Sequence, residues 1–109
     1  RQAVVAARTI VEFDNAITAP RHGWRDAAQY YAVNSSIRFL PEVEVPLLVL
    51  HSRDDPMVPV GPYDAVDWSA LPNVECILTD HGGHVGFHGR EPQPWYVPTA
   101  VGFLEGALR

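Results

Sequence analysis

Hydrophobic residues along this chain recur with one period in its first part and with another after that. In residues 1–13 and 24–33 they return every three or four positions, which predicts two amphipathic helices. Further along, residues 47–50 form a continuous apolar run, and the mostly apolar residues 74–79 predict a second short buried strand. Runs of this kind are typical of strands that are buried on both faces of a parallel sheet.

Prolines and glycines separate these predicted elements. A loop is expected at residues 20–23, and a short helix or turn at 35–40 that stops before Pro41. Residues 63–70 predict a crossover helix between the two strands, and residues 97–108 predict a closing helix. We therefore expect one domain over residues 1–109, with a helical segment over 1–44 and a βαβ unit plus the closing helix over 45–109.

This inventory predicts an α/β fold whose sheet is incomplete. Parallel sheets normally contain more than two strands and carry helices on both faces. An exposed strand edge also pairs readily with another segment. The chain begins at Arg1 without a methionine, so we expect a piece of a longer protein. It should need the upstream half of its domain, or self-association along the open edge.

Composition and charge exclude several classes of protein. The chain has 109 residues, a net charge of −5 and scattered basic residues, so no nucleic-acid partner is expected. No apolar run is long enough to span a bilayer, and no signal-peptide pattern opens the chain. The single cysteine, Cys76, falls inside a predicted strand and is expected to be a core residue. These features favour a reducing, cytoplasmic setting.

An acidic residue and a histidine each follow one of the two predicted strands. Asp55 comes after the first strand, and His84 lies in a glycine-rich turn after the second. Because functional groups collect at the carboxyl ends of parallel strands, we expect these two side chains to meet. A carboxylate that orients a histidine is two thirds of a nucleophile–histidine–acid triad. Asp54 competes with Asp55 for the role of the acid, and both carboxylates could instead simply cap a turn.

Another interpretation of the same loops remains open at this point. His81, His84 and His88 could ligate Zn²⁺ with an oxygen from Asp80 or Asp55, although the glycines between them argue against one ligating face. We expect no metal and no cofactor. If Asp55 and His84 instead serve a triad, Met57 beside the acid is the apolar residue that we expect to contact the substrate.

The chain offers no candidate for the nucleophile of a triad. None of the serines lies in Gly-x-Ser-x-Gly, the strained turn that such a site requires. The neighbours of Ser52 are too bulky for that turn, Ser69 falls in the predicted crossover helix, and Cys76 lies in mid-strand. The remaining serines are Ser35 and Ser36.

Three stretches resemble the YheT-like family of α/β-hydrolases, also labelled embryogenesis-associated hydrolases. Residues 11–24 resemble the segment before the family's last strands, and residues 45–50 with Asp54-Asp55-Pro56 resemble its acid loop. Residues 81–87, with the sequence His-Gly-Gly-His-Val-Gly-Phe, resemble its histidine loop and are the most specific of the three. The resemblance implies the C-terminal part of an α/β-hydrolase fold, with its last two parallel strands and their flanking helices.

The resemblance also implies a function. Asp55 would be the triad acid, His84 the triad base and His81 a loop residue, in a serine hydrolase that acts on carboxylic esters or lipids. The family's nucleophilic serine and oxyanion hole lie upstream of anything in this chain, so residues 1–109 alone should be inactive. The alternative is a non-catalytic fragment or a binding module that keeps the hydrolase scaffold.

Overall fold

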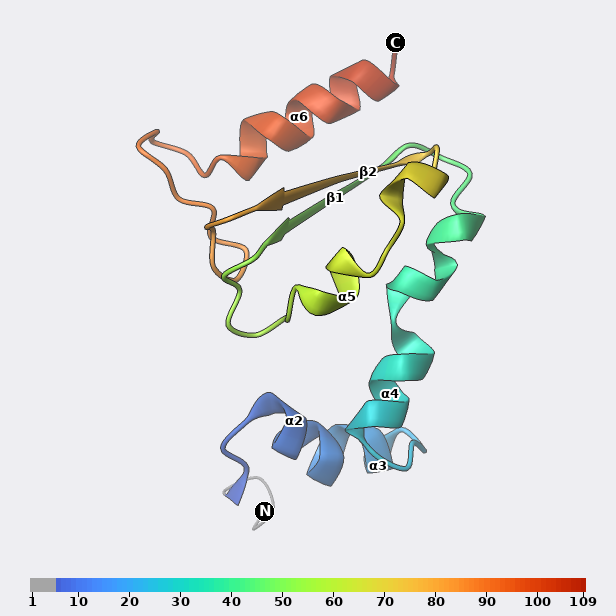
Figure 1. The fold of residues 1–109 in the computed structure, drawn as a ribbon. Coiled ribbons are helices and arrows are strands. Elements are labelled where there is room, and N and C mark those ends of the chain that lie inside the picture. The colour runs from blue at the N-terminus through green and yellow to red at the C-terminus, as the bar shows by residue number, and fades with distance from the viewer. Residues whose placement is uncertain (1–5) are drawn as a thin grey trace. The chain divides into compact units, whose positions relative to one another are not determined.

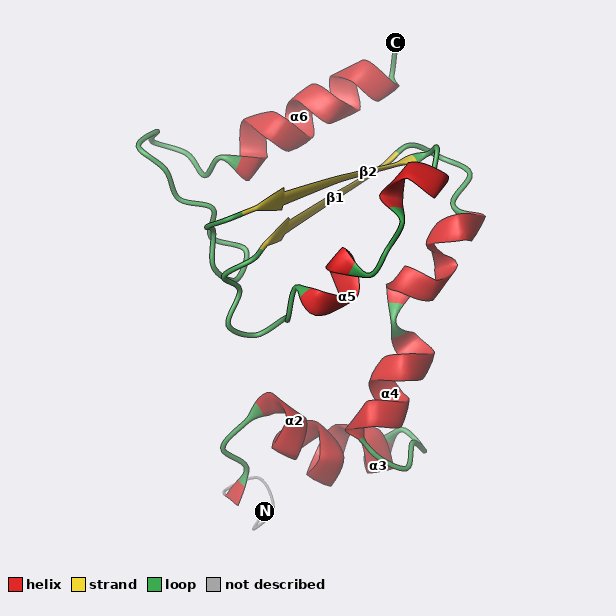
Figure 2. Cartoon of the chain, in the orientation of Figure 1, coloured by secondary structure: helices red, strands yellow, loops and turns green. Residues whose placement is uncertain are grey.

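The computed structural model describes residues 6–109, which fall into two compact units that divide between residues 36 and 37. Helices make up the first unit, and two strands with helical segments make up the second (Figures 1 and 2). Within the described residues, no helix is both long enough and apolar enough to cross a membrane.

The first unit contains a longer helical stretch than the sequence predicts. Helix α2 (Ile10–Phe13) continues through a π-helical turn at Asp14–Thr18 into α3 (Ala19–Arg21). The predicted end at residue 13 is therefore wrong, and residues 1–5 of that predicted helix lie outside the described part. Pro20 does not stop the helix, since it lies at the start of α3, directly after the π-helical turn.

Helix α4 (Ala27–Asn34) completes the first unit and confirms the second predicted helix, with a later start. The carboxylate of Asp26 accepts a hydrogen bond from the N–H of Gln29 at 2.8 Å, and this cap sets where the helix begins. The side chain of Asn15 accepts one from the N–H of Ala27 at 2.8 Å. This bond ties α4 to the π-helical turn.

A 3₁₀-helix over Ser36–Glu42 follows α4 and contains Pro41. The predicted stop before this proline is wrong, since the fixed φ of proline suits 3₁₀ geometry as well as α-helical geometry.

The two predicted strands are present and parallel. Strands β1 (Leu47–Ser52) and β2 (Val74–Thr79) pair from Leu47 opposite Val74 to Ser52 opposite Thr79. Within residues 6–109 they form a two-stranded sheet. This result agrees with the α/β class predicted for the C-terminal part of a hydrolase. However, residues 47–50 are only half-buried, so the predicted burial on both faces is wrong for the described chain.

The connection between the strands is less helical than predicted. It contains α5 (Gly61–Asp64) and a separate 3₁₀ turn at Trp68–Ala70, in place of one helix over 63–70. The side chain of Asp67 accepts a hydrogen bond from the N–H of Ser69 at 3.2 Å. This local bond starts a new turn and competes with continuation of the first helix.

The closing helix α6 (Tyr96–Ala107) confirms the last predicted element. Within the second unit, α6 and α5 lie on opposite sides of the strand pair (Figure 1). Helix α6 packs against β1, and the Tyr63 ring of α5 stacks on the ring of His51 from β1. Because β1 and β2 are parallel, the loops that follow their carboxyl ends leave the sheet at the same end.

Candidate active site

Asp55 and His84 meet at the carboxyl ends of the two strands. Nδ1 of His84 lies 3.0 Å from Oδ2 of Asp55 and 3.3 Å from Oδ1. Asp55 belongs to the loop after β1 and His84 to the loop after β2. The parallel register of the strands thus brings together the two residues that the sequence predicts to pair.

The carboxylate of Asp55 is buried and held by its own loop. Its side chain is 4% exposed. Its Oδ1 accepts hydrogen bonds from the N–H groups of Met57 at 2.8 Å and Val58 at 3.0 Å. Burial raises the pKa of Asp55, but these two backbone donors and His84 outweigh it and lower the pKa to about 2. The group is therefore an anion over the whole pH range in which a histidine titrates.

The two carboxylate oxygens of the neighbouring Asp54 have different partners. Oδ1 accepts a hydrogen bond from the N–H of Gly83 at 2.8 Å, and Oδ2 lies 3.4 Å from Nδ1 of His81. Its side chain is 43% exposed, in contrast to that of Asp55. The Gly83 N–H, with smaller contributions from Ser52 and His81, lowers the pKa of Asp54. Each aspartate thus faces one histidine of the loop after β2, and of the two carboxylates only that of Asp55 is buried.

The backbone around His84 takes an uncommon path. Gly83 has φ +59°, and Val85 and Phe87 also have positive φ, at 54° and 48°. Such values are rare for residues with bulky side chains and cluster at functional sites. The turn is closed by a hydrogen bond from the N–H of Phe87 to the carbonyl of Gly82 at 2.9 Å. His84 therefore lies in a tight loop whose backbone is specified residue by residue.

Gly82 fits beneath the ring of Phe87. A Cβ at this position would lie 2.6 Å from Cδ1 of Phe87 and 3.0 Å from Cβ of Ser52. The ring is buried, so it cannot move aside without opening the loop. Only a glycine therefore allows this close approach.

We expect Gly82→Ala to destabilise the protein by about 1–3 kcal/mol, because the added methyl group overpacks a closed site. Urea unfolding of the full-length protein measures this change. Gly89→Ala is the matched control, since nothing lies within 4 Å of a Cβ built there. Equal unfolding free energies for the two variants would contradict this account of the loop.

Sequence comparison gives three informative relatives of the chain. It is 42% identical over 93 residues to "Putative esterase YheT" of Escherichia coli, a match that covers 83% of the chain and 27% of that protein. It is 36% identical over 100 residues to "Monoacylglycerol lipase" of Saccharomyces cerevisiae, covering 90% and 22%. It is 28% identical over 106 residues to "Embryogenesis-associated protein EMB8" of Picea glauca, covering 94% and 23%. These relatives indicate an α/β-hydrolase, in agreement with the resemblance to the YheT-like family.

This YheT-like chain spans about a quarter of the length of the curated relatives that it matches, between 20% and 28%. No family model matches it, and no solved structure does. The match nevertheless covers the loops that carry Asp55 and His84, because it extends over most of the chain. The three stretches that resemble the family and the relatives found by comparison therefore agree.

His51 is a residue of this YheT-like site that sequence reasoning missed. Its side chain is 7% exposed, and its ring stacks on that of Tyr63 with centroids 4.1 Å apart. Nε2 lies 3.1 Å from the carbonyl of Val58, and Nδ1 lies 4.0 Å from Oδ2 of Asp55. His51 thus braces the loop that holds Asp55. The available signal was a histidine that interrupts an apolar strand next to its carboxyl end.

In the second unit, none of the serines and the cysteine is paired with the imidazole of His84. Ser52 is 1% exposed and donates a hydrogen bond to the carbonyl of Gly83, and Ser69 donates one to Asp67. Cys76 is half-buried on β2, and burial raises the pKa of its thiol. Within residues 37–109, no serine or cysteine hydrogen-bonds to Nε2 of His84.

The three histidines of the alternative zinc interpretation have different surroundings. His84 faces Asp55 and His81 faces Asp54, while His88 lines a cavity of about 280 Å³ with His81, Phe87 and Trp95. Among residues 6–109, no group of three or more metal-ligating side chains is gathered closely enough to hold an ion. Met57 is exposed, and its N–H serves Asp55.

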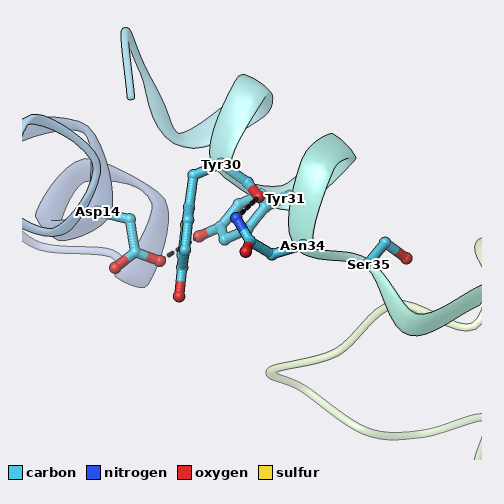
Figure 3. A pocket seen from close by; sticks show the side chains of 5 residues that line it. All are labelled: Asp14, Tyr30, Tyr31, Asn34 and Ser35. Carbon is cyan, nitrogen blue, oxygen red and sulfur yellow. Dashed lines mark hydrogen bonds between the residues drawn. The ribbon is translucent and has the colours of Figure 1, made fainter. Parts of the chain in front are cut away.

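A separate pocket of about 410 Å³ lies in the first unit and contains none of these residues. Its walls are Asp14, Tyr30, Tyr31, Asn34 and Ser35 (Figure 3). The hydroxyl of Tyr31 donates a hydrogen bond to the carboxylate of Asp14, and this bond raises the pKa of Tyr31 to about 12. Hydrogen bonds from Thr18 and Tyr31 lower the pKa of Asp14. The carboxylate is thus already satisfied by partners within its own unit.

Proposed function

We propose that this chain supplies the acid and the base of a serine hydrolase that acts on carboxylic esters. The observation that carries the proposal is the contact of 3.0 Å between Oδ2 of Asp55 and Nδ1 of His84. The names of the relatives, an esterase and a lipase among them, support ester chemistry and lipid-like substrates. The nucleophilic serine would lie outside residues 1–109, in a longer protein that contains them.

In the proposed mechanism, Asp55 keeps the proton of His84 on Nδ1 and leaves Nε2 able to accept one. Nε2 removes the proton of the serine hydroxyl as the serine attacks the ester carbonyl, and the carboxylate stabilises the imidazolium that forms. The imidazolium then donates its proton to the departing alcohol, which leaves an acyl-enzyme. His84 next activates a water molecule, and the attack of this water releases the acid and restores the serine.

The electrostatics of the pair support these roles. Asp55 is held as an anion by two backbone N–H groups, so it remains an acceptor when His84 takes up a proton. The imidazole is 41% exposed, while the carboxylate behind it is buried. This arrangement presents the outer edge of the ring to an approaching group and hides the inner edge. A cytoplasmic setting stays a prediction from the single cysteine.

Hydrolysis of a nitrophenyl ester tests the proposal and separates it from the binding-module alternative. The full-length protein should turn over the ester, whereas residues 1–109 alone should not, because they lack the proposed nucleophile. Turnover by residues 1–109 that is lost in His84→Ala would place the nucleophile within this chain. An inactive full-length protein would favour a binding module.

The open sheet suggests what the isolated chain lacks. Residues 47–50 are half-buried, and Val101 and Leu104 of α6 are exposed, as is Leu108 directly after it. We propose that the upstream part of the same domain covers these surfaces, and that without it the chain associates with itself. Analytical ultracentrifugation of residues 1–109 should show oligomers. A single monomeric species that unfolds cooperatively would contradict this proposal.

A further inference from the structure

We propose that Asp54 and Ser52 are positioning residues that hold the backbone of Gly83 from two sides and thereby place His84 against Asp55. The proposal rests on the function proposed above. It assigns to Asp54 a part other than that of the triad acid, and it gives Ser52 a part other than that of a nucleophile.

The two hydrogen bonds fix successive peptide groups of the loop. Oδ1 of Asp54 accepts a hydrogen bond from the N–H of Gly83 at 2.8 Å, which holds the peptide between Gly82 and Gly83. Oγ of Ser52 donates one to the carbonyl of Gly83 at 2.5 Å, which holds the peptide between Gly83 and His84. The second peptide carries the backbone nitrogen of His84. Its orientation therefore decides where the Cα–Cβ bond of His84 points.

Gly83 is the residue whose backbone conformation these two hydrogen bonds restrict most. Its φ of +59° lies in a region that glycine enters readily, but glycine also populates many other conformations. Fixing the backbone of one residue costs conformational entropy. The hydrogen bond to the charged Asp54 carboxylate and the bond from Ser52 to the Gly83 carbonyl offset that cost. Together these two hydrogen bonds restrict the flexible Gly82-Gly83 turn to one conformation.

Ser52 and Asp54 come from a part of the chain that is itself rigid. Ser52 is the last residue of β1, it pairs in register with Thr79, and it is 1% exposed. Asp54 lies two residues further on, directly before Asp55. The segment that carries the acid therefore also carries the two groups that hold the histidine loop. Any displacement of this segment would move Asp55 and His84 together, which keeps their contact of 3.0 Å intact.

The contact between His81 and Asp54 does not carry the same weight. The distance from Nδ1 of His81 to Oδ2 of Asp54 is 3.4 Å, and the imidazole is 91% exposed. Exposed ion pairs of this kind contribute little. His81→Ala is therefore a matched control, since it removes a partner of Asp54 and leaves the bond to Gly83 in place.

The test measures kcat and KM for a nitrophenyl ester in the full-length protein. We expect Asp54→Ala to lower kcat by about 10²-fold with little change in KM, because a small displacement of the base impairs proton transfer more than binding. Asp54→Asn, which keeps an oxygen acceptor for the Gly83 N–H, should recover most of the loss. His81→Ala should behave as the wild type.

A double-mutant cycle with His84→Ala decides whether Asp54 acts through the histidine. In the His84→Ala background, Asp54→Ala should cause no further loss. Additive losses, or a wild-type kcat for Asp54→Ala, would overturn the positioning proposal. If Asp54→Ala does not fold, Ser52→Ala carries the same expectations, and a wild-type kcat for Ser52→Ala would overturn it equally. If His84→Ala itself keeps full activity, the proposed function fails instead.

Discussion

Replacing His84 with alanine should lower kcat for ester hydrolysis by the full-length protein by about 10⁴- to 10⁶-fold. No other side chain in the described chain faces Asp55 as closely, since the next histidine ring nitrogen, Nδ1 of His51, lies 4.0 Å from Oδ2. Without the imidazole, the serine hydroxyl would keep its proton, and the departing alcohol would receive none. Steady-state kinetics with a nitrophenyl ester measure the loss.

The control for this variant lies in the same loop. His81→Ala removes an exposed imidazole that faces Asp54 rather than Asp55, so it should keep wild-type kcat. Circular dichroism and a thermal unfolding curve would show that both variants are folded. A His84→Ala protein that is folded and retains more than about a tenth of wild-type kcat would rule out the proposed base.

Replacing Asp55 with asparagine should lower kcat by about 10⁴-fold. The asparagine would fill the same space, but its amide can donate a hydrogen bond to Nδ1 and so favour the wrong tautomer of His84. The variant also removes the anion that stabilises the imidazolium. Steady-state kinetics with a nitrophenyl ester, measured for the wild type and the variant, give the loss.

The lowered pKa of Asp55 determines how the stability of the folded state depends on pH. A carboxyl group whose pKa falls from 3.8 to about 2 on folding stabilises the folded state above pH 3.8 and loses that contribution as the pH falls toward 2. Asp55 itself should therefore contribute no inflection to the activity profile above pH 4.

Asp54→Asn is the paired control for Asp55→Asn, since it should keep most of the activity. If Asp54→Asn were the more damaging of the two changes, the acid role would move to Asp54.

The parts of the fold that the sequence predicts are those specified by local pattern. The apolar runs at 47–50 and 74–79 predict strands, and the structure has strands at Leu47–Ser52 and Val74–Thr79. Helix ends were predicted less well, because single contacts decide them. Asp67 caps a new turn that divides the crossover, and Pro20 is tolerated where a helix turn begins.

The same distinction separates the predicted from the unpredicted parts of the site. The contact between Asp55 and His84 follows from two parallel strands that end at one edge, so spacing along the chain was sufficient. The hydrogen bonds of Ser52 and Asp54 with Gly83 could not be predicted in this way, because they depend on the direction in which each side chain points at the end of the strand. His51 looked like one more residue of a buried strand, since its partners Tyr63 and Val58 come close only after the crossover folds back.

Labelling of the full-length protein with a fluorophosphonate probe, followed by mass spectrometric mapping, tests the central claim most directly. The probe reacts with a serine only when a base activates it. We predict one labelled serine outside residues 1–109, with labelling strongly reduced in His84→Ala and Asp55→Asn and retained in His81→Ala. Labelling of a residue within 1–109, or labelling that His84→Ala leaves unchanged, would contradict the claim that Asp55 and His84 serve a serine elsewhere in the protein.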